Sequence, residues 1–237
     1  MSQAAVRQQR AAACFEDYYA NKGDDRNDPL RNPGVLFQNL AFEKSIVEAL
    51  RKIQIDKEHW KFLDVGCGAG FSLLRLLSYG IEPERLHGID IVETRVTRGQ
   101  RRIPSLNLVH GDAAAMHYQT ASFDLAMEST VFVQILDEST ARAIAREMVR
   151  VIRPGGYIVL SDWRYGFPRS KYRGLSRRRI AELFAVGEQT EFVCQTKGAL
   201  LPPLGRALSR YLPSLYFLLC AVLPVLVGQT TVVLRRR

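Results

Sequence analysis

The ten residues KFLDVGCGAG, at positions 61–70, decide the fold of this chain. An apolar run that can form a strand ends with the acidic residue Asp64, and three glycines follow at alternate positions, Gly66, Gly68 and Gly70. Glycine has no Cβ and adopts a positive φ at little cost, so a ligand can lie directly against such a backbone. An apolar, helix-like run comes next. The stretch therefore predicts a strand, a ligand-binding turn and a helix.

The glycine spacing differs from that of a dinucleotide-binding turn, which has the pattern G-x-G-x-x-G after a wholly apolar strand. In this sequence Phe71 stands where the third glycine of that pattern would fall, and Asp64 stands at the strand end. A negative charge is of little use beside a pyrophosphate, whereas it attracts an ammonium group. The turn therefore favours a zwitterionic ligand that carries an ammonium group.

Four more strand-like runs follow, each after an interval that suits a βαβ unit. They lie at residues 85–91, 106–110, 122–128 and, behind a Pro-Gly-Gly turn, 157–160. The residues at their ends are Asp90 and Ile91, Asp112 and Ala113, Glu128, and Asp162. An acidic residue about 20 positions beyond a glycine turn is well placed to accept hydrogen bonds from ribose hydroxyls.

In order and spacing, these runs resemble the motifs of the class I S-adenosylmethionine-dependent methyltransferases over residues 60–163. The resemblance implies an α/β fold with a doubly wound, seven-stranded, mainly parallel sheet whose last strand, at residues 229–234, is antiparallel. It also implies S-adenosylmethionine as the cofactor, with Asp90 on the ribose and Asp112 or the backbone of Ala113 on the adenine amino group. The implied cofactor-binding residues are Tyr18, Asp64, Gly66, Cys67, Gly68, Gly70, Asp90, Ile91, Asp112, Ala113 and Glu128. The alternative is an α/β domain whose loops bind another ligand.

Residues 36–54 and 138–152 carry apolar residues at helical spacing and predict amphipathic helices. Strands that alternate with helices favour a parallel, doubly wound sheet. We expect residues 1–35 to form an N-terminal helix and loop that cap the cofactor site, and residues 36–237 to form the methyltransferase domain. Tyr18 or Tyr19 would close the pocket, since residues 15–20 resemble the aromatic helix that covers the cofactor in many relatives; simple packing against the first helix is the alternative.

Residues 164–228 are predicted to be a basic and apolar insertion on the acceptor side. Its first part, together with Trp163, interleaves aromatic residues with seven basic ones and contains no acidic residue up to position 180. Arginines there suit a phosphate or carboxylate, or else they belong to a solvated helix that begins at Ser176 as its N-cap. The candidate substrate-binding residues are Gln134, Trp163, Arg164 and Tyr165.

The second part of this insertion, residues 200–227, is strongly apolar but contains prolines and two arginines. A membrane span needs about 20 uninterrupted apolar residues, and the strand at 229–234 must return to the sheet. We therefore expect core packing for this segment. The alternatives are that it lines a hydrophobic acceptor pocket or rests on a membrane surface.

The composition indicates the cellular compartment and the classes of partner that are expected. The four cysteines lie far apart, which argues against a disulfide framework and a zinc site, and no apolar segment follows the first arginines as a signal peptide requires. We expect a cytoplasmic protein, with the inner face of a membrane as a further location. The 33 basic against 24 acidic residues keep an anionic or lipid-linked acceptor open; nucleic acid is not expected, and the oligomeric state is left open.

Methyl transfer from a sulfonium is an in-line displacement, so the protein mainly positions the nucleophile. A hydroxyl acceptor also needs a base, for which Glu128 and Asp162 are the candidates; Gln134 replaces the histidine that many small-molecule O-methyltransferases have there. The sequence predicts O-methylation of a small hydroxylated metabolite: a sugar, a lipid-linked acceptor or a secondary metabolite. One alternative is an RNA- or protein-directed methyltransferase. Another is a non-enzymatic scaffold; it predicts no cofactor binding, so the presence of Asp64, Asp90 and Asp112 argues against it.

Overall fold

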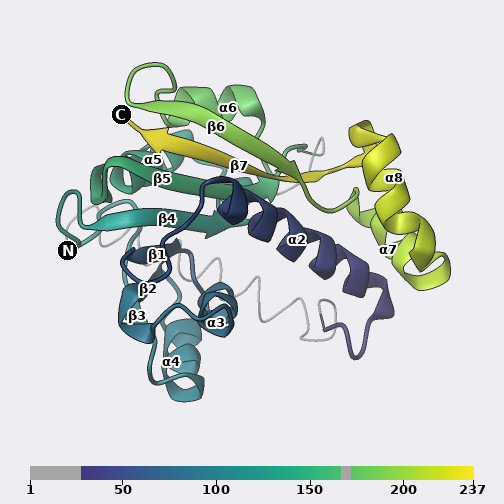
Figure 1. Ribbon diagram of the computed structural model, residues 1–237, viewed down its shortest axis with the longest axis horizontal. Coiled ribbons are helices and arrows are strands. Elements are labelled where there is room, and N and C mark those ends of the chain that lie inside the picture. Colours follow the sequence, from purple (N-terminus) through teal and green to yellow (C-terminus); the bar gives the residue numbers. More distant parts are fainter. Residues whose placement is uncertain (1–27, 167–171) are drawn as a thin grey trace.

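The computed structural model describes residues 28–166 and 172–237. Their strands form one seven-stranded sheet in the order β3-β2-β1-β4-β5-β7-β6 (Figure 1). The strands are β1 (Phe62–Val65), β2 (Leu86–Asp90), β3 (Asn107–His110), β4 (Phe123–Ser129), β5 (Ile152–Trp163), β6 (Thr190–Lys197) and β7 (Gln229–Arg236). Neighbouring strands are parallel, except that β7 is antiparallel to both β5 and β6. The predicted fold class, with its antiparallel last strand, is confirmed.

Helices cover both faces of the sheet. The α-helices are α2 (Leu36–Lys52), α3 (Phe71–Ser78), α4 (Glu93–Arg102), α5 (Glu138–Val151), α6 (Arg177–Leu183), α7 (Pro202–Tyr211) and α8 (Tyr216–Val222). Short 3-10 helices are η2 (Pro33–Val35), η3 (Pro83–Arg85), η4 (Phe132–Gln134), η5 (Pro213–Leu215) and η6 (Pro224–Leu226). Apolar side chains of α2, α3 and α4 pack in one core cluster, and those of α5 and α6 pack in another on the opposite face. This three-layer arrangement is the one that buries a parallel sheet on both sides.

The register of the parallel strands brings the predicted site residues to one edge of the sheet. Val65, the last residue of β1, pairs with Ile89 on one side and with Glu128 on the other. Asp90 pairs with His110 at the end of β3. Ligands of open α/β sheets bind at the carboxyl ends of the strands, so the fold gathers these residues where a ligand is expected.

Strand β5 begins earlier than the sequence predicts. Ile152 already pairs with Phe123, directly after α5 ends, and the register shifts before Leu125 pairs with Tyr157. The Pro-Gly-Gly stretch is therefore an irregularity within the strand and not a turn in front of it. Gly155 has φ +79°, and a Cβ on Gly156 would lie 2.7 Å from the carbonyl oxygen of Asp124, so both glycines are needed for this path.

A buried polar network fixes α2 against the antiparallel part of the sheet. The hydroxyl of Thr231 lies 2.8 Å from the hydroxyls of both Ser45 on α2 and Ser161 on β5. Gln229 donates to the same Ser161 hydroxyl at 2.8 Å, and Thr196 donates to the carbonyl of Ser45 at 2.7 Å. Each hydroxyl thus has a partner, which removes the cost of burying it.

The range predicted as an insertion, 164–228, contains α6 and the edge strand β6 as well as an apolar unit, residues 200–227, made of α7, η5, α8 and η6. The unit directly precedes β7, whose first residue, Gln229, pairs with Trp163 at the carboxyl end of β5. Figure 1 shows α7 and α8 beyond that end of the sheet, beside the start of α2.

Core packing holds for only one side of this apolar unit. Tyr216, Cys220 and Leu208 are buried in a small cluster with residues of α2, but between residues 211 and 225 only Tyr216, Leu219 and Cys220 are not exposed. The physical reason is that two short helices broken by prolines present only one face to the sheet edge. In the part of the chain that the structure describes, no helix is both long and apolar enough to cross a membrane.

Candidate functional site

The glycine turn joins β1 to α3 through an unusual backbone path. Gly66, Gly68 and Gly70 have φ values of +74°, +55° and +82°, which L side chains rarely adopt. The N–H of Gly66 donates to the carbonyl of Ile89 at 2.8 Å, and the N–H of Cys67 donates to the same carbonyl at 3.1 Å. The turn is therefore fastened to β2, as a pre-formed ligand loop requires.

Asp90 connects this turn to the start of α4. One carboxylate oxygen accepts a hydrogen bond from the N–H of Gly68 at 2.7 Å, and the other accepts one from Val92 at 2.8 Å. Each oxygen retains a lone pair that can accept a further bond. The predicted contact with ribose hydroxyls is therefore compatible with the bonds that Asp90 already makes.

Asp64 has a buried carboxyl group that a ligand could satisfy. It is 1% exposed, and within the described residues neither of its carboxylate oxygens has a hydrogen bond of ordinary geometry. Burial and the nearby charge of Asp90 raise the pKa of Asp64 to about 8, although Arg95 and the hydroxyl of Ser72 oppose this rise. A buried carboxyl group without a partner is costly. A cationic group of a ligand would satisfy it.

Two side chains lie against the glycine turn and were missed in the sequence. A Cβ on Gly66 would collide with Val131, and a Cβ on Gly68 would collide with the guanidinium of Arg95. Arg95 also lies 3.8 Å from the Asp90 carboxylate, with a third of its side chain exposed. A ligand that lies directly on Gly68 must displace this guanidinium. The only signal in the sequence is the position of Arg95 one turn into the helix after Asp90.

The turn after β3 holds the residues predicted to bind adenine. Asp112 accepts a hydrogen bond from the N–H of Ala114 through its side chain at 2.8 Å, which shapes the backbone around Ala113. His110 lies 3.1 Å from the carbonyl oxygen of Ile91 and so ties this turn to the end of β2. Asp112, Ala113 and Ile91 therefore lie at the same edge as Asp90.

The two candidate bases, Glu128 and Asp162, are buried at the ends of the neighbouring strands β4 and β5. Glu128 accepts from the N–H of Val131 at 2.9 Å, and Asp162 accepts from Val133 at 2.8 Å and Trp163 at 2.7 Å. Burial and the charge of Asp162 raise the pKa of Glu128 well above its usual range. Burial raises the pKa of Asp162 to about 7, although its hydrogen bonds lower it.

Both carboxyl groups thus hold the turn that follows β4, which also contains the candidate Gln134. The side chain of Gln134 donates to the carbonyl of Thr130 at 2.6 Å. A pKa near 7 suits a general base, but a base must also reach the acceptor's proton. The catalytic role of Glu128 and Asp162 therefore stays a prediction.

The candidate substrate residues after β5 contact the apolar unit. Arg164 donates to the carbonyl of Pro224 at 2.9 Å, and its guanidinium lies 4.6 Å from the centre of the Tyr165 ring. The hydroxyl of Tyr165 donates to the carbonyl of Val225 at 3.2 Å. Trp163 packs on the cluster that contains Tyr216.

Among the described arginines that follow in this segment, the helix interpretation is correct about the N-cap but not about solvation of every arginine. Ser176 caps α6 by accepting from the N–H of Arg179 at 3.2 Å. Arg179 is buried, and its guanidinium donates to the carbonyls of Arg173 at 2.8 Å and Phe132 at 3.2 Å. Arg173 forms an ion pair with Glu138 at 2.7 Å. Tyr18 and Tyr19, predicted to close the cofactor pocket, lie outside the described residues.

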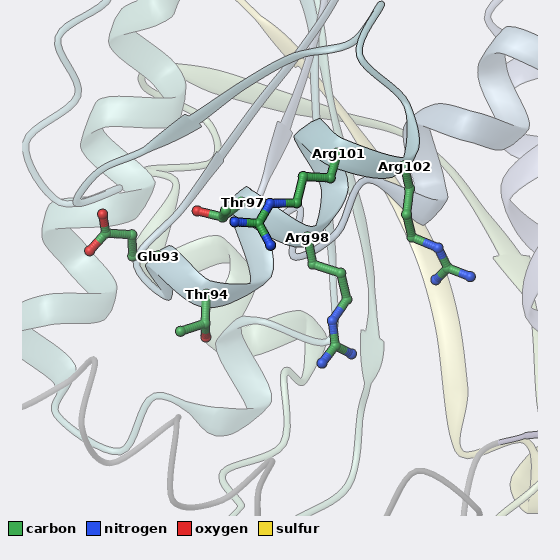
Figure 2. Close-up of a pocket in the computed structure, with 6 residues that line it drawn as sticks. All are labelled: Glu93, Thr94, Thr97, Arg98, Arg101 and Arg102. Atoms are coloured by element: carbon green, nitrogen blue, oxygen red, sulfur yellow. The ribbon is translucent and has the colours of Figure 1, made fainter.

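A recess on the surface runs along α4 and is lined by that helix alone (Figure 2). Its lining residues are Glu93, Thr94, Thr97, Arg98, Arg101 and Arg102. It does not include the glycine turn or any of the predicted site residues. Three arginines and one carboxylate line it, so the recess is basic.

Comparison with known proteins supports this geometry. Residues 62–156 match the family model described as "Methyltransferase domain". A phthiotriol/phenolphthiotriol dimycocerosates methyltransferase of Mycobacterium ulcerans is 31% identical over 131 residues, which are 51% of this chain and 47% of that protein. A demethylmenaquinone methyltransferase of Renibacterium salmoninarum is 28% identical over 170 residues, 69% of this chain and 63% of that protein. The chain thus matches about half the length of the mycobacterial relative.

Solved structures share the fold at low identity. The magnesium protoporphyrin IX methyltransferase of Synechocystis PCC 6803, solved with bound SAH, superposes with a TM-score of 0.65 at 13% identity over 100% of both chains. The PH0226 protein of Pyrococcus horikoshii OT3 gives a TM-score of 0.63 at 14% identity over 93% of this chain and 99% of that one.

The fold is that of the class I, Rossmann-like methyltransferases, as the sequence predicted. Within that class, residues 62–156 carry the methyltransferase domain of the matched family. Two of the solved structures with this fold are titled as an S-adenosylmethionine dependent methyltransferase of Mesorhizobium loti and as a methyltransferase with bound SAH.

Proposed function

We propose that this protein is an S-adenosylmethionine-dependent methyltransferase that methylates a hydroxyl group of a small, lipid-linked acceptor. The observation that carries the cofactor assignment is the buried, unpartnered carboxyl group of Asp64 beside the glycine turn. A cationic donor would supply the missing hydrogen bonds and stabilise the ionised form, and the ammonium group of S-adenosylmethionine is such a donor. A dinucleotide would leave the carboxyl group unsatisfied.

The chain's own residues then have distinct tasks. Asp64 would hold the ammonium group, Asp90 the ribose hydroxyls, and the turn at Asp112 and Ala113 the adenine. When bound, the cofactor supplies a methyl group already activated on its sulfonium. The protein aligns the acceptor oxygen with that methyl group, excludes water and removes the hydroxyl proton. The carboxyl group of Asp162, with its pKa of about 7, is our candidate for that proton.

Two observations support a lipid-linked acceptor. The relatives with the names quoted above act on phthiotriol dimycocerosates and on demethylmenaquinone. In this chain the candidate substrate residues Arg164 and Tyr165 contact an exposed apolar unit. The fold does not decide whether the methyl group goes to oxygen or to carbon, because a solved structure with the same fold is titled a geranyl diphosphate C-methyltransferase. Transfer to oxygen is therefore a separate part of the proposal. The cytoplasm, where the cofactor is available, is the compartment that we propose.

Calorimetric titration with S-adenosylmethionine tests the cofactor site. The wild-type protein should bind, and Asp90→Ala should weaken binding by more than about tenfold, because hydrogen bonds to a charged group contribute about 1.5–3 kcal/mol each. Asp56→Ala, at an exposed carboxylate bonded to His59, is the matched control and should bind as the wild type does. Tight binding by Asp90→Ala would contradict the ribose contact. No binding by the wild type would favour the scaffold alternative.

The acceptor class is tested with cofactor labelled in its methyl group and a lipid extract. Label should appear in a lipid fraction, and chemical cleavage of the product should release it as a methyl ether or ester. Label that stays on carbon would refute the transfer to oxygen but not the methyltransferase.

A polymer-directed methyltransferase is the second candidate, and the basic recess on α4 is the observation that favours it (Figure 2). Arg98, Arg101 and Arg102 could neutralise phosphates there. If RNA is the acceptor, RNA affinity should fall steeply with salt and should fall further in Arg98→Ala. RNA binding without either dependence would remove this candidate.

A further inference from the structure

We propose that the apolar surface of residues 211–225, called here the α8 surface, docks the protein on an anionic phospholipid bilayer. The α8 surface comprises the end of α7, η5, α8 and the first two residues of η6. The docking itself does not depend on methyl transfer; only the delivery of a lipid-linked acceptor rests on the proposed function.

The α8 surface is both uncharged and exposed. Residues 211–225 contain no acidic or basic residue. Leu218, Val222 and Val225 are 57%, 63% and 65% exposed, and Tyr211 and Leu212 are exposed beside them. Leu218 and Val222 are four residues apart on α8, so they lie on the same face of that helix. Single exposed apolar residues are ordinary, whereas a continuous group of them marks an interaction site.

The opposite face of α8 is already anchored in the protein. Tyr216 is fully buried, accepts a hydrogen bond from the N–H of Leu200 at 3.2 Å and packs its ring 5.9 Å from that of Phe37. Cys220 is buried in the same cluster. The helix is therefore apolar all round while only one side is covered. A helix with this pattern needs a second apolar environment on its other side.

The geometry fits a membrane surface and not a span. Helix α8 has seven residues, and Pro213 and Pro224 bound it on both sides. A span needs about 20 apolar residues. A short helix with exposed apolar residues lies in the plane of the bilayer interface, where aromatic residues such as Tyr211 and Phe217 are also favoured.

Three cationic side chains contact the α8 surface. The ammonium group of Lys197 donates to the carbonyl of Ala221 at 3.2 Å, and Arg164 donates to that of Pro224. The guanidinium of Arg210 lies 5.3 Å from the centre of the Tyr211 ring. No acidic residue occurs between positions 192 and 237. Basic residues around an apolar surface complement anionic headgroups. A symmetric dimer through the same surface would instead place cations opposite cations.

The α8 surface also lies next to the acceptor side of the site. The N–H of Arg164 donates to the carbonyl of Gly228 at 2.9 Å, and a Cβ on Gly228 would lie 3.2 Å from the ring of Trp163. Docking would therefore place Trp163 and the carboxyl end of β5 beside the bilayer. A lipid-linked acceptor could then reach the site without crossing water.

Sedimentation of the full chain with vesicles tests the proposal. We expect binding to vesicles of equal parts phosphatidylcholine and phosphatidylglycerol, and weaker binding to phosphatidylcholine alone. Leu218→Asp should weaken binding by more than about tenfold, since it places a charge in the apolar contact. Lys197→Gln should weaken only the binding to anionic vesicles, by roughly fivefold. Leu74→Asp, at an exposed leucine on α3, is the control and should bind as the wild type does. Val225→Asp replaces Leu218→Asp if circular dichroism shows that the latter is unfolded.

Three outcomes would overturn the docking: no binding of the wild type to either vesicle, equal binding by folded Leu218→Asp, or a dimer by light scattering that Leu218→Asp dissociates while no vesicle is bound. Calorimetry with S-adenosylmethionine on the same samples separates this proposal from the proposed function. Vesicle binding without cofactor binding would refute only the function, and the reverse would refute only the docking.

Discussion

Arg95 lies on the glycine turn, in the place that a ligand lying against Gly68 would take, and it faces the Asp90 carboxylate. The guanidinium is partly exposed and sits on a long, flexible side chain. We therefore expect that displacing the guanidinium costs little free energy and lowers the affinity for a cofactor only slightly. In the absence of a cofactor, the contact of Arg95 with the turn keeps the turn ordered.

Replacing Arg95 tests this arrangement. We expect Arg95→Ala to strengthen binding of S-adenosylmethionine by up to about fivefold, because breaking a partly exposed ion pair costs about 0.2–1 kcal/mol. Calorimetric titration measures the change. Arg98→Ala, one turn along the exposed side of α4, should leave the affinity unchanged. Weaker binding by Arg95→Ala would show instead that the guanidinium contacts the cofactor.

Single residues differ in how far the sequence could place them. Asp64, Asp90 and Glu128 were placed correctly at strand ends, because an apolar run followed by a carboxylate fixes both the strand and its end. Arg95 and Val131 could not be placed, since their positions over the glycines follow from side-chain packing between elements that are distant in the sequence. The same limit applies to the burial of Arg179, which stands among exposed arginines in the sequence.

At the scale of elements, Arg179 joins α6 to the turn after β4. Its guanidinium donates to carbonyls of Phe132 and Ile135, each at 3.2 Å, and to that of Arg173. The arginine thus supplies donors to carbonyl groups at the two ends of η4 and before α6.

We expect Arg179→Met to lower the free energy of unfolding by about 2–4 kcal/mol, because it removes the buried donors to the carbonyls of Arg173 and Ile135 and the ion pair with Glu138. Denaturant unfolding followed by circular dichroism measures the loss. Its neighbour Arg178, whose side chain is 90% exposed and pairs with Glu182, provides the control. Arg178→Met should change the free energy by less than about 0.5 kcal/mol. Equal effects of the two variants would refute the structural role of Arg179.

The periodicity of the sequence predicted the order of strands and helices, but it did not predict how the apolar unit packs. The segment 200–227 was expected to pack in the core because apolar residues usually do. Pro213 and Pro224 cut it into pieces too short to wrap around the sheet, and only one side of α8 reaches the protein. Hydrophobicity alone cannot distinguish a buried helix from one that meets a partner.

For the whole molecule, three buried carboxyl groups make stability depend on pH. The pKa of Asp64 is about 8 and that of Asp162 about 7, and that of Glu128 is also raised. In the unfolded chain such groups titrate near pH 4. Between these values the folded state binds more protons than the unfolded state, so the free energy of unfolding falls as pH rises.

We therefore expect the protein without cofactor to lose at least about 2 kcal/mol of stability between pH 5 and pH 8. Denaturant unfolding at several pH values measures this. Asp64→Asn should make the decrease shallower and stabilise the protein at pH 8, whereas Asp56→Asn, at an exposed position, should keep the wild-type slope. A pH-independent stability of the wild type would show that these carboxyl groups are not buried in solution.

The insertion of β7 between β5 and β6 has a consequence for synthesis on the ribosome. Strand β6 is made before β7, yet it pairs with no other strand of the sheet. A nascent chain that has not yet reached Gln229 therefore holds β5 with an open edge and β6 with no place to attach. Emergence of the eight residues of β7 from the ribosome closes both at once, so a chaperone that shields the β5 edge would have to stay bound until that moment.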